Sequence, residues 1–311
     1  MSNTLCAAFW NHTNVRPDNR IFPCCRFKTP VATFTGDVGS ILHTKEYLKL
    51  REDSSNGVHI TGCEKCYYEE RQGKESLRER FNREYTTDTV ELRYLEIGFD
   101  NICNLACDGC WEEWSSTWAN IKSPDTKKIN ILTTEEFYNV PSTVDKVLFL
   151  GGEPLMTSRH IRFLETLPDP SSVSVIYYTN GTFLFSDQEI VFLKKFKSVK
   201  VYVSIDAVGE LNDRVRSGSR WTDILRFLDQ MRTTDFSITI NSVVHANNWH
   251  GFKDLADFIH TNSYDWCTNV LTYPQKLDII NLEPEEKIKF GELLAGIDIP
   301  NKEYIIKHLT R

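Results

Sequence analysis

The segment RYLEIGFDNICNLACDGC, residues 93–110, joins a short apolar run to a loop that carries three cysteines. The apolar run, residues 93–99, predicts a β-strand. The loop that follows brings Cys103, Cys107 and Cys110 close together in the sequence and offers no obvious fourth thiol. Three ligands are one fewer than a closed metal site needs. What these thiols do therefore depends on where the loop lies in the fold.

The sequence after residue 92 alternates short apolar runs with helical stretches. Further runs that predict strands are KVLFLGG (146–152), SVIYYTNG (174–181), VKVYVSIDA (199–207), FSITINSVV (236–244) and TNVLTYP (268–274). Helix candidates between them cover residues 111–122, 158–167, 187–196, 221–231 and 251–261. This alternation is typical of βαβ units and a parallel sheet. The strands are too few for a closed eight-stranded barrel, so we expect an α/β fold with a partial (β/α)6 TIM-like barrel over residues 91–275.

Two further segments flank the expected barrel. Residues 1–90 are rich in cysteines and turns and end in a charged helical run, EKCYYEERQGKESLRERFNREY (64–85). We expect them to form a small irregular cysteine-rich domain that is held together by metal rather than by a core. Residues 276–311 predict a helical tail, with helices near 284–295 and 301–309.

Composition limits the compartment and the partners. The chain has 311 residues, 41% of them hydrophobic, and a net charge of −7, so it can bury a large core and has no overall basic field for nucleic acid or anionic lipid. No apolar run approaches the roughly 20 residues of a membrane span, and the N-terminus lacks a signal-peptide pattern. We therefore expect a cytoplasmic protein without a membrane or nucleic-acid partner. In a reducing compartment, clustered cysteines indicate metal ligands rather than disulfides.

The loop of residues 101–110, called the cluster loop below, follows the first expected strand, where a parallel barrel places its active-site loops. Three thiolates leave one coordination position open, which distinguishes catalytic metal sites from structural ones. An iron–sulfur cluster suits this arrangement, because a four-iron cube with three cysteine ligands keeps one iron available. The alternative is a zinc site completed by Asp108 or by a distant histidine.

Four loops at expected strand ends resemble those of the radical S-adenosylmethionine (radical SAM) enzymes, in the same order. They are the C-x3-C-x2-C cluster loop, GGEP (151–154), TNG (179–181) and SIDA (204–207), within roughly residues 92–275. The resemblance implies that the cluster-loop cysteines hold a [4Fe-4S] cluster and that S-adenosylmethionine fills the open position. An electron from the reduced cluster would cleave S-adenosylmethionine, and the resulting 5′-deoxyadenosyl radical would remove hydrogen from a substrate.

The resemblance also implies residues that bind S-adenosylmethionine. The GGEP glycines would let the backbone approach the methionine ammonium, and the GGEP glutamate would offer it an acceptor. The SIDA serine would bond the ribose or the carboxylate, and the arginine of RSG would pair with the carboxylate in a fork geometry. In other proteins such residues are often simple turns or solvated surface charges. The full set is Gly151, Gly152, Glu153, Asn180, Ser204, Arg216 and Asn247.

One position departs from the family pattern. The residue before the last cluster cysteine is usually large in relatives, where it lies against adenine, and here it is Gly109. Trp111, Trp114 and Trp118 form an i, i+3, i+7 stripe on the expected helix after the loop, and Trp111 is the candidate replacement. The alternative is that this stripe belongs to the core.

The N-terminal cysteines resemble the cluster-binding pattern of the twitch and SPASM modules that accompany many radical SAM enzymes. The matching stretches are CAAFWNHTNVRPDNRIFPCC (6–25), ILHTKEYLKLRED (41–53) and GCEKCYYEE (62–70). The resemblance implies an auxiliary [4Fe-4S] cluster. Adjacent side chains rarely reach one metal together, so we favour Cys24 over Cys25, and we expect His12 to be a surface residue. The expected ligands are Cys6, Cys24, Cys63 and Cys66; a structural zinc knuckle is the alternative.

These observations together predict a radical SAM enzyme. The expected substrate is a peptide or protein, and the expected reductant is of the flavodoxin or ferredoxin type. One alternative is the radical oxidation of a small polar metabolite. An alternative of another class is a non-catalytic binding or sensor protein that zinc or an iron–sulfur cluster staples together.

Overall fold

The structure is a computed structural model that describes residues 4–35, 37–122, 124, 129–132 and 140–311. The chain divides into two compact units. The first unit comprises Met1–Asn101, Asn130–Ile176 and Val191–Val199, and the second comprises Ile102–Ile129, Tyr177–Ile190 and Lys200–Arg311. No helix in the described part of the chain is long and apolar enough to cross a membrane.

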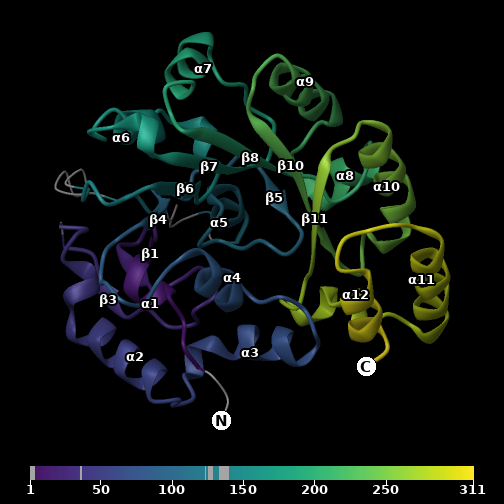
Figure 1. The fold of residues 1–311 in the computed structure, drawn as a ribbon. Coiled ribbons are helices and arrows are strands. Elements are labelled where there is room, and N and C mark those ends of the chain that lie inside the picture. The colour runs from purple at the N-terminus through teal and green to yellow at the C-terminus, as the bar shows by residue number, and fades with distance from the viewer. Residues whose placement is uncertain (1–3, 36, 123, 125–128, 133–139) are drawn as a thin grey trace. The chain divides into compact units, whose positions relative to one another are not determined.

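The sheet of the first unit has the strand order β6-β4-β1-β2-β3. The bounds are Lys146–Leu150 (β6), Tyr94–Gly98 (β4), His12–Val15 (β1), Arg20–Phe22 (β2) and Ala32–Thr33 (β3). β4 pairs in parallel with β6 and with β1, whereas β2 is antiparallel to both β1 and β3. The N-terminal strands therefore extend the sheet beyond β4 (Figure 1).

The N-terminal segment is more regular than its sequence pattern predicts. Besides three strands, it contains the helices α1 (Ala8–Asn11), α2 (Lys45–Ser55), α3 (Glu64–Arg71) and α4 (Leu77–Glu84). The charged helical run divides into α3 and α4 because the backbone turns at Gly73, whose φ is 75°. Ser76 and Glu79 then form a capping box that begins α4.

The same segment has a hydrophobic core. Phe9, Phe22 and Phe81 are buried in it, and Cys6 and Cys63 pack in the same cluster. Burial of large aromatic side chains supplies folding energy that does not depend on metal. This differs from the expectation of a segment without a core, because the apolar residues that build the core are far apart in the sequence.

The second unit contains a parallel sheet in which β10 (Ser237–Val244) lies between β8 (Ser198–Ser204) and β11 (Asp265–Val270). β7 (Ser174–Thr179) and β8 begin in the first unit and end in the second. β11 ends at Val270, so the strand predicted over residues 268–274 is displaced along the sequence. Parallel strands that alternate with helices confirm the predicted α/β fold.

The helices between the strands are α5 (Ser116–Lys122), α6 (Arg159–Leu164), α7 (Asp187–Leu193), α8 (Glu210–Val215), α9 (Trp221–Arg232) and α10 (Phe252–Thr261). Two very short strands, β5 (Ala106–Cys107) and β9 (Arg216–Ser217), pair with each other. The predicted C-terminal helices are present as α11 (Pro284–Gly296) and α12 (Lys302–Leu309). Because α5 begins at Ser116, Trp111 and Trp114 precede it, and the predicted helical tryptophan stripe is wrong.

Candidate functional site

The three thiols of the cluster loop are partly buried in the second unit, and in the described part of the chain neither they nor other His, Cys, Asp or Glu side chains form a group of three or more arranged to hold a metal ion. Burial raises the pKa of the Cys110 thiol to about 12, and negative charge on Cys107 and Cys103 adds to the rise. The sulfur of Cys103 also accepts hydrogen bonds from the N–H of Leu105 at 3.5 Å and from the side-chain amide of Asn180 at 3.9 Å. Partly buried thiols with N–H donors fit an anionic iron–sulfur cluster.

Neighbouring elements hold the cluster loop in this shape. The pairing of β5 with β9 sets Cys107 opposite Arg216. From α5, the hydroxyl of Thr117 donates to the carbonyl of Cys103 at 2.6 Å, and the indole N–H of Trp118 donates to the carbonyl of Cys107 at 2.9 Å. The backbone of two cluster cysteines is therefore fixed by side chains that follow in the sequence.

Arg216 supplies a buried positive charge beside the thiols. Its side chain is 12% exposed, and its Nη1 donates to the carboxylate of Asp206 at 2.7 Å. Burial opposes the charge, but the nearby Cys107 and Asp206 raise the pKa of Arg216, so it stays protonated. Its Nε is buried and has no hydrogen-bond partner among the described residues. The guanidinium thus keeps one donor for an anionic ligand, although the ion pair that it forms here is with Asp206.

Asp206, which belongs to the SIDA motif, is itself fixed by backbone and amide groups. Its carboxylate accepts the N–H of Val243 at 2.8 Å, and its own N–H donates to the side chain of Asn212 at 3.2 Å. The side-chain amide of Asn248 donates to the carbonyl of Asp206 at 2.9 Å. Sequence reasoning assigned no role to Asp206. The available signal was that Asp206 lies in SIDA, one of the four motif loops at expected strand ends.

Two predicted ligand residues contact the cluster loop itself. Asn180 is buried and donates to the side chain of Asn104 at 3.0 Å, and it accepts the N–H of Thr182 at 2.9 Å. Asn247 donates to the carboxylate of Asp108 at 2.7 Å. Both amides therefore position the loop, and binding of S-adenosylmethionine by either one stays a prediction.

Two other sequence features lie in the second unit. Ser204 is the last residue of β8 and is partly buried. Gly109 has a φ of 77°, and a Cβ at this position would lie 2.7 Å from a methyl carbon of Leu271. Leu271 therefore occupies the space next to Gly109, while Trp111 packs edge to face on Tyr273 with ring centroids 5.8 Å apart.

The GGEP loop follows β6 in the first unit. Gly151 has a φ of 134°, and a Cβ there would lie 2.6 Å from the carbonyl oxygen of Asp100. Gly152 donates its N–H to that same carbonyl at 3.0 Å. Glu153 is buried, and its carboxylate accepts the N–H of Leu155 at 3.1 Å. The loop therefore needs glycine for a close backbone approach, and its glutamate caps the short helical turn that follows.

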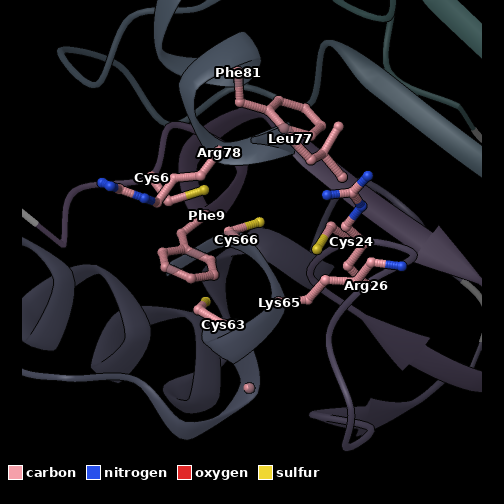
Figure 2. A pocket seen from close by; sticks show the side chains of 11 residues that line it. Cys6, Phe9, Cys24, Arg26, Cys63, Lys65, Cys66, Leu77, Arg78 and Phe81 are labelled. Atoms are coloured by element: carbon pink, nitrogen blue, oxygen red, sulfur yellow. The ribbon is translucent and has the colours of Figure 1, made fainter. Parts of the chain in front are cut away.

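A pocket in the first unit is lined by four cysteines from separate parts of the chain. Cys6 precedes α1, Cys24 follows β2, Cys63 precedes α3 and Cys66 lies in the first turn of α3. Figure 2 shows their sulfur atoms around one space, close to the ring of Phe9. These are the four ligands expected for the auxiliary cluster, and we call this site the four-cysteine pocket. Cys25 does not line it.

The pocket thiols lie within electrostatic reach of one another. Burial raises the pKa of Cys63 to about 12, and charge on Cys66 adds to the rise. Burial also raises the pKa values of Cys6 and Cys24, again with contributions from neighbouring thiols. Among the described residues, no group of three or more His, Cys, Asp or Glu side chains is arranged to hold a metal ion. The thiols are therefore close together without being closed around a single ion.

His12 is fully buried and is not the surface residue that we expected. Its Nε2 lies 3.4 Å from the carboxylate of Glu96, and its Nδ1 lies 2.7 Å from the carbonyl of Pro23. Asn14, opposite Glu96 in the register of β1 and β4, donates to the same carboxylate at 2.6 Å. A buried carboxylate requires such partners. Sequence reasoning missed Glu96 because its strand was interpreted from its apolar residues.

Comparison with known families identifies the core of the chain. The model of the Radical SAM superfamily matches residues 97–259, more than half of the chain, including the cluster loop, GGEP and SIDA. The chain belongs to the radical SAM superfamily. It is therefore an enzyme of the radical SAM type, whose cofactors are S-adenosylmethionine and a [4Fe-4S] cluster. The superfamily is consistent with the predicted partial barrel.

Curated relatives in the radical SAM superfamily are GTP 3′,8-cyclases. The probable GTP 3′,8-cyclase of Methanocaldococcus jannaschii is 26% identical over 242 residues, which are 76% of this chain and 72% of that protein. The GTP 3′,8-cyclase of Clostridium botulinum strain Okra is 26% identical over 226 residues, 70% of this chain and 64% of that protein.

Solved structures of radical SAM enzymes are also similar to this chain. Native anSMEcpe with bound AdoMet is 18% identical, with a TM-score of 0.49, over 66% of this chain and 60% of that one. The chain thus spans less than two thirds of that structure and of the Clostridium relative.

Proposed function

We propose that this radical SAM enzyme cleaves S-adenosylmethionine at a [4Fe-4S] cluster held by Cys103, Cys107 and Cys110. When bound, the cluster and S-adenosylmethionine would supply a radical that removes hydrogen from an unreactive carbon of a substrate. The observation that carries the proposal is a loop with three cysteines within eight residues, whose backbone α5 and β9 hold and beside which the buried Arg216 lies. Three protein ligands leave one coordination position for the cosubstrate.

The chain's own residues would bind and orient the cosubstrate. Arg216 would direct its remaining buried donor, Nε, to the carboxylate of S-adenosylmethionine, while Asp206 keeps the guanidinium in place. In the first unit, the GGEP backbone would accept the methionine ammonium, together with the carboxylate of Glu153. Ser204 would bond the ribose or the carboxylate. Asn180 and Asn247 would act mainly by holding the cluster loop.

We further propose that the four-cysteine pocket holds an auxiliary [4Fe-4S] cluster of the twitch or SPASM type. Four buried thiols within electrostatic reach of one another support this proposal. In this arrangement residues 1–90 carry the auxiliary cluster, residues 91–275 carry the radical chemistry and residues 276–311 form a helical tail. A flavodoxin- or ferredoxin-type protein in the cytoplasm would supply the electrons.

The substrate has two candidate classes. A peptide or protein is the first, supported by the resemblance of the N-terminal cysteine pattern to modules found in peptide-modifying radical SAM enzymes. A small anionic metabolite of the nucleotide kind is the second, supported by the similarity to GTP 3′,8-cyclases. The true substrate should increase 5′-deoxyadenosine release above the uncoupled rate. When it is labelled with deuterium at the reacting carbon, that deuterium should appear at the 5′ carbon of 5′-deoxyadenosine.

Metal analysis tests whether the two proposed [4Fe-4S] clusters are present. Protein that is reconstituted without oxygen should contain about eight irons and eight sulfides per chain, about four for each cluster, and should release 5′-deoxyadenosine from S-adenosylmethionine when reduced. Replacing Cys63 and Cys66 by alanine should lower iron to about four while uncoupled cleavage continues. Stoichiometric zinc in place of iron would instead support the non-catalytic alternative.

A further inference from the structure

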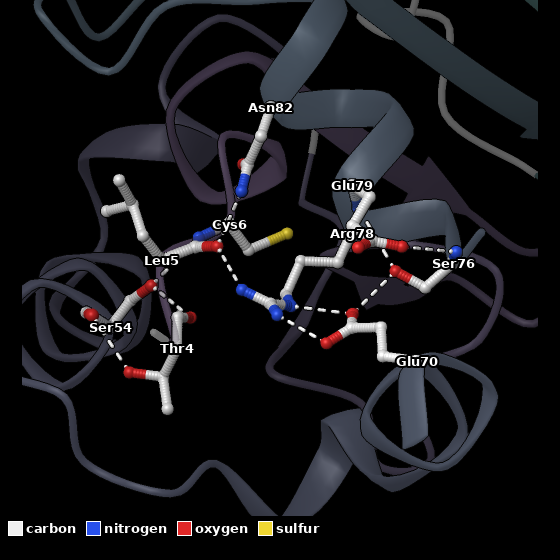
Figure 3. Close-up of polar contacts among 9 residues, drawn as sticks. All are labelled: Thr4, Leu5, Cys6, Ser54, Glu70, Ser76, Arg78, Glu79 and Asn82. Atoms are coloured by element: carbon white, nitrogen blue, oxygen red, sulfur yellow. Dashed lines mark hydrogen bonds and ion pairs between the residues drawn. The ribbon is translucent and has the colours of Figure 1, made fainter. Parts of the chain in front are cut away.

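Arg78 on α4 links the four-cysteine pocket to the surrounding protein. It lines the pocket, and its side chain is only 8% exposed. Its Nη1 donates to the carbonyl of Leu5 at 2.9 Å, while Nε and Nη2 donate to the two carboxylate oxygens of Glu70 at 3.0 and 2.5 Å (Figure 3). The guanidinium thus uses a bidentate fork on one side and a backbone contact next to Cys6 on the other.

The contact with Leu5 is part of a set that fixes the backbone on both sides of Cys6. Asn82, one turn further along α4, also donates to the carbonyl of Leu5, at 2.8 Å, and accepts the N–H of Ala7 at 2.7 Å. The N–H of Cys6 donates to the hydroxyl of Ser54 on α2 at 3.1 Å. Figure 3 shows Arg78 and Asn82 in contact with Leu5, the residue before Cys6.

Cys6 needs such restraint more than Cys63 and Cys66 do. Cys63 and Cys66 lie next to and within α3, so a helix sets their separation. Cys6 lies before α1, outside any helix or strand, so contacts with other elements must set its position. The hydrogen bonds of Arg78, Asn82 and Ser54 fix the backbone around Cys6.

Arg78 also carries charge. Its guanidinium lines the same pocket as the Cys6 and Cys63 side chains and bonds the carbonyl next to Cys6, so a buried positive charge lies beside these thiols. Arg26 lines the same pocket and pairs with the buried carboxylate of Glu69, and Lys65 lines it from an exposed position. Arg78 differs from both in its hydrogen bond to the carbonyl of Leu5, which places its charge on the Cys6 side of the site.

We propose that Arg78 is a positioning and tuning residue of the auxiliary-cluster site: it holds Cys6 in the ligand set, and it places a buried positive charge beside the thiolates. A nearby cation stabilises the more negative, reduced form of a cluster, so Arg78 raises the reduction potential of this one. This inference rests on the proposed auxiliary cluster.

The experiment isolates that cluster by using the full chain with the three cluster-loop cysteines changed to alanine. In this background the two roles of Arg78 are separated by two changes. Arg78→Lys keeps the charge and loses the fork. Arg78→Gln combined with Glu70→Gln removes both charges of the ion pair, so no carboxylate is left unpaired; because Arg78 lines the pocket and Glu70 does not, the cluster should respond mainly to the loss of the cation. Arg83→Gln is the matched control, because Arg83 lies on the same helix, pairs with Glu75 and is 62% exposed.

Iron content, circular dichroism and a redox titration followed by electron paramagnetic resonance are the measurements. Arg78→Lys should lower iron occupancy several-fold while the potential of the remaining cluster stays near that of the parent. The double variant should shift the oxidised-to-reduced ratio about tenfold towards the oxidised form, which is about 59 mV for one electron. Arg83→Gln should change neither value.

Each half of the inference has its own refutation. Full iron occupancy in folded Arg78→Lys would overturn the positioning role, and an unchanged potential in the double variant would overturn the tuning role. If the double variant folds but takes up no cluster, occupancy in Arg78→Lys decides between the two roles, because only that variant keeps the charge. A parent chain that holds no iron in this background would refute the auxiliary cluster itself, a different result from any change confined to Arg78.

Discussion

Changing Gly151 to alanine tests whether the GGEP loop needs glycine for its backbone approach. At a φ of 134° an L-residue is strained by about 1–3 kcal/mol. The new Cβ would lie 2.6 Å from the carbonyl oxygen of Asp100, closer than real Cβ contacts, so one of the two backbones must move. That movement breaks the bond from Gly152 to the same carbonyl, at a cost of about 1 kcal/mol. We expect a total loss of about 2–4 kcal/mol.

Urea unfolding of the metal-free variant, followed by tryptophan fluorescence, measures this loss. Gly73→Ala is the matched control in the same unit, because Gly73 has a φ of 75° and nothing within 4 Å of its Cβ position. Left-handed strain alone should cost the control about 1–2 kcal/mol. The difference between the two variants then reports the steric contact with Asp100.

The functional consequence follows from the same displacement. If the GGEP backbone moves, its carbonyls no longer lie where they would accept the methionine ammonium, so cleavage of S-adenosylmethionine should fall more than stability explains. A Gly151→Ala variant that unfolds at the same urea concentration as Gly73→Ala would refute the reasoning. Unchanged cleavage in a destabilised variant would remove GGEP from the binding site but leave the packing argument intact.

Three further predictions concern other parts of the chain. Changing the three cluster-loop cysteines to alanine should abolish 5′-deoxyadenosine release and leave about four irons per chain; release that persists would contradict the motif assignment. Gly291→Ala should stabilise α11 by about 0.5–1 kcal/mol in thermal unfolding, because this helical glycine has nothing within 4 Å of its Cβ position, and a lower midpoint would contradict this. Although burial opposes it, His12 and Asn14 lower the pKa of Glu96. Glu96 therefore contributes stability above its unfolded pKa of about 4.3, and Glu96→Gln should flatten the loss of stability as the pH falls below that value.

The strands of the barrel could be predicted because each carries its own signal. The apolar runs that became β4, β6, β7, β8 and β10 are continuous and lie between helical stretches, so local pattern was enough. The N-terminal strands could not be predicted in this way. β2 and β3 are three and two residues long, and β1 contains His12 and Asn14, polar residues that are buried only because Glu96 lies opposite in β4. Their pairing depends on residues far away in the sequence.

In the candidate site, too, local patterns could be predicted from the sequence and contacts between distant residues could not. The cluster-loop thiols and the SIDA motif were visible as local patterns, and the structure places Arg216 beside those thiols. The ion pair between Arg216 and Asp206 was not visible, because nothing in the spacing of two charged residues says which will be buried together. Arg78 gave no signal at all, since in the sequence it is one of several basic residues on a charged helix.

The two cysteine sites differ in how much chain entropy is lost when their ligands come together. The cluster loop holds its three thiols within eight residues, so little chain entropy is lost when they converge, and a few hydrogen bonds from α5 are sufficient. The four-cysteine pocket gathers ligands from residue 6 to residue 66, and closing that larger loop must be supported by other contacts. The aromatic core around Phe9 supplies part of that support, and the clamp from Arg78 to Leu5 supplies the orientation of the most distant ligand. Packing and hydrogen bonds of the protein thus share with the proposed cluster the cost of closing this loop.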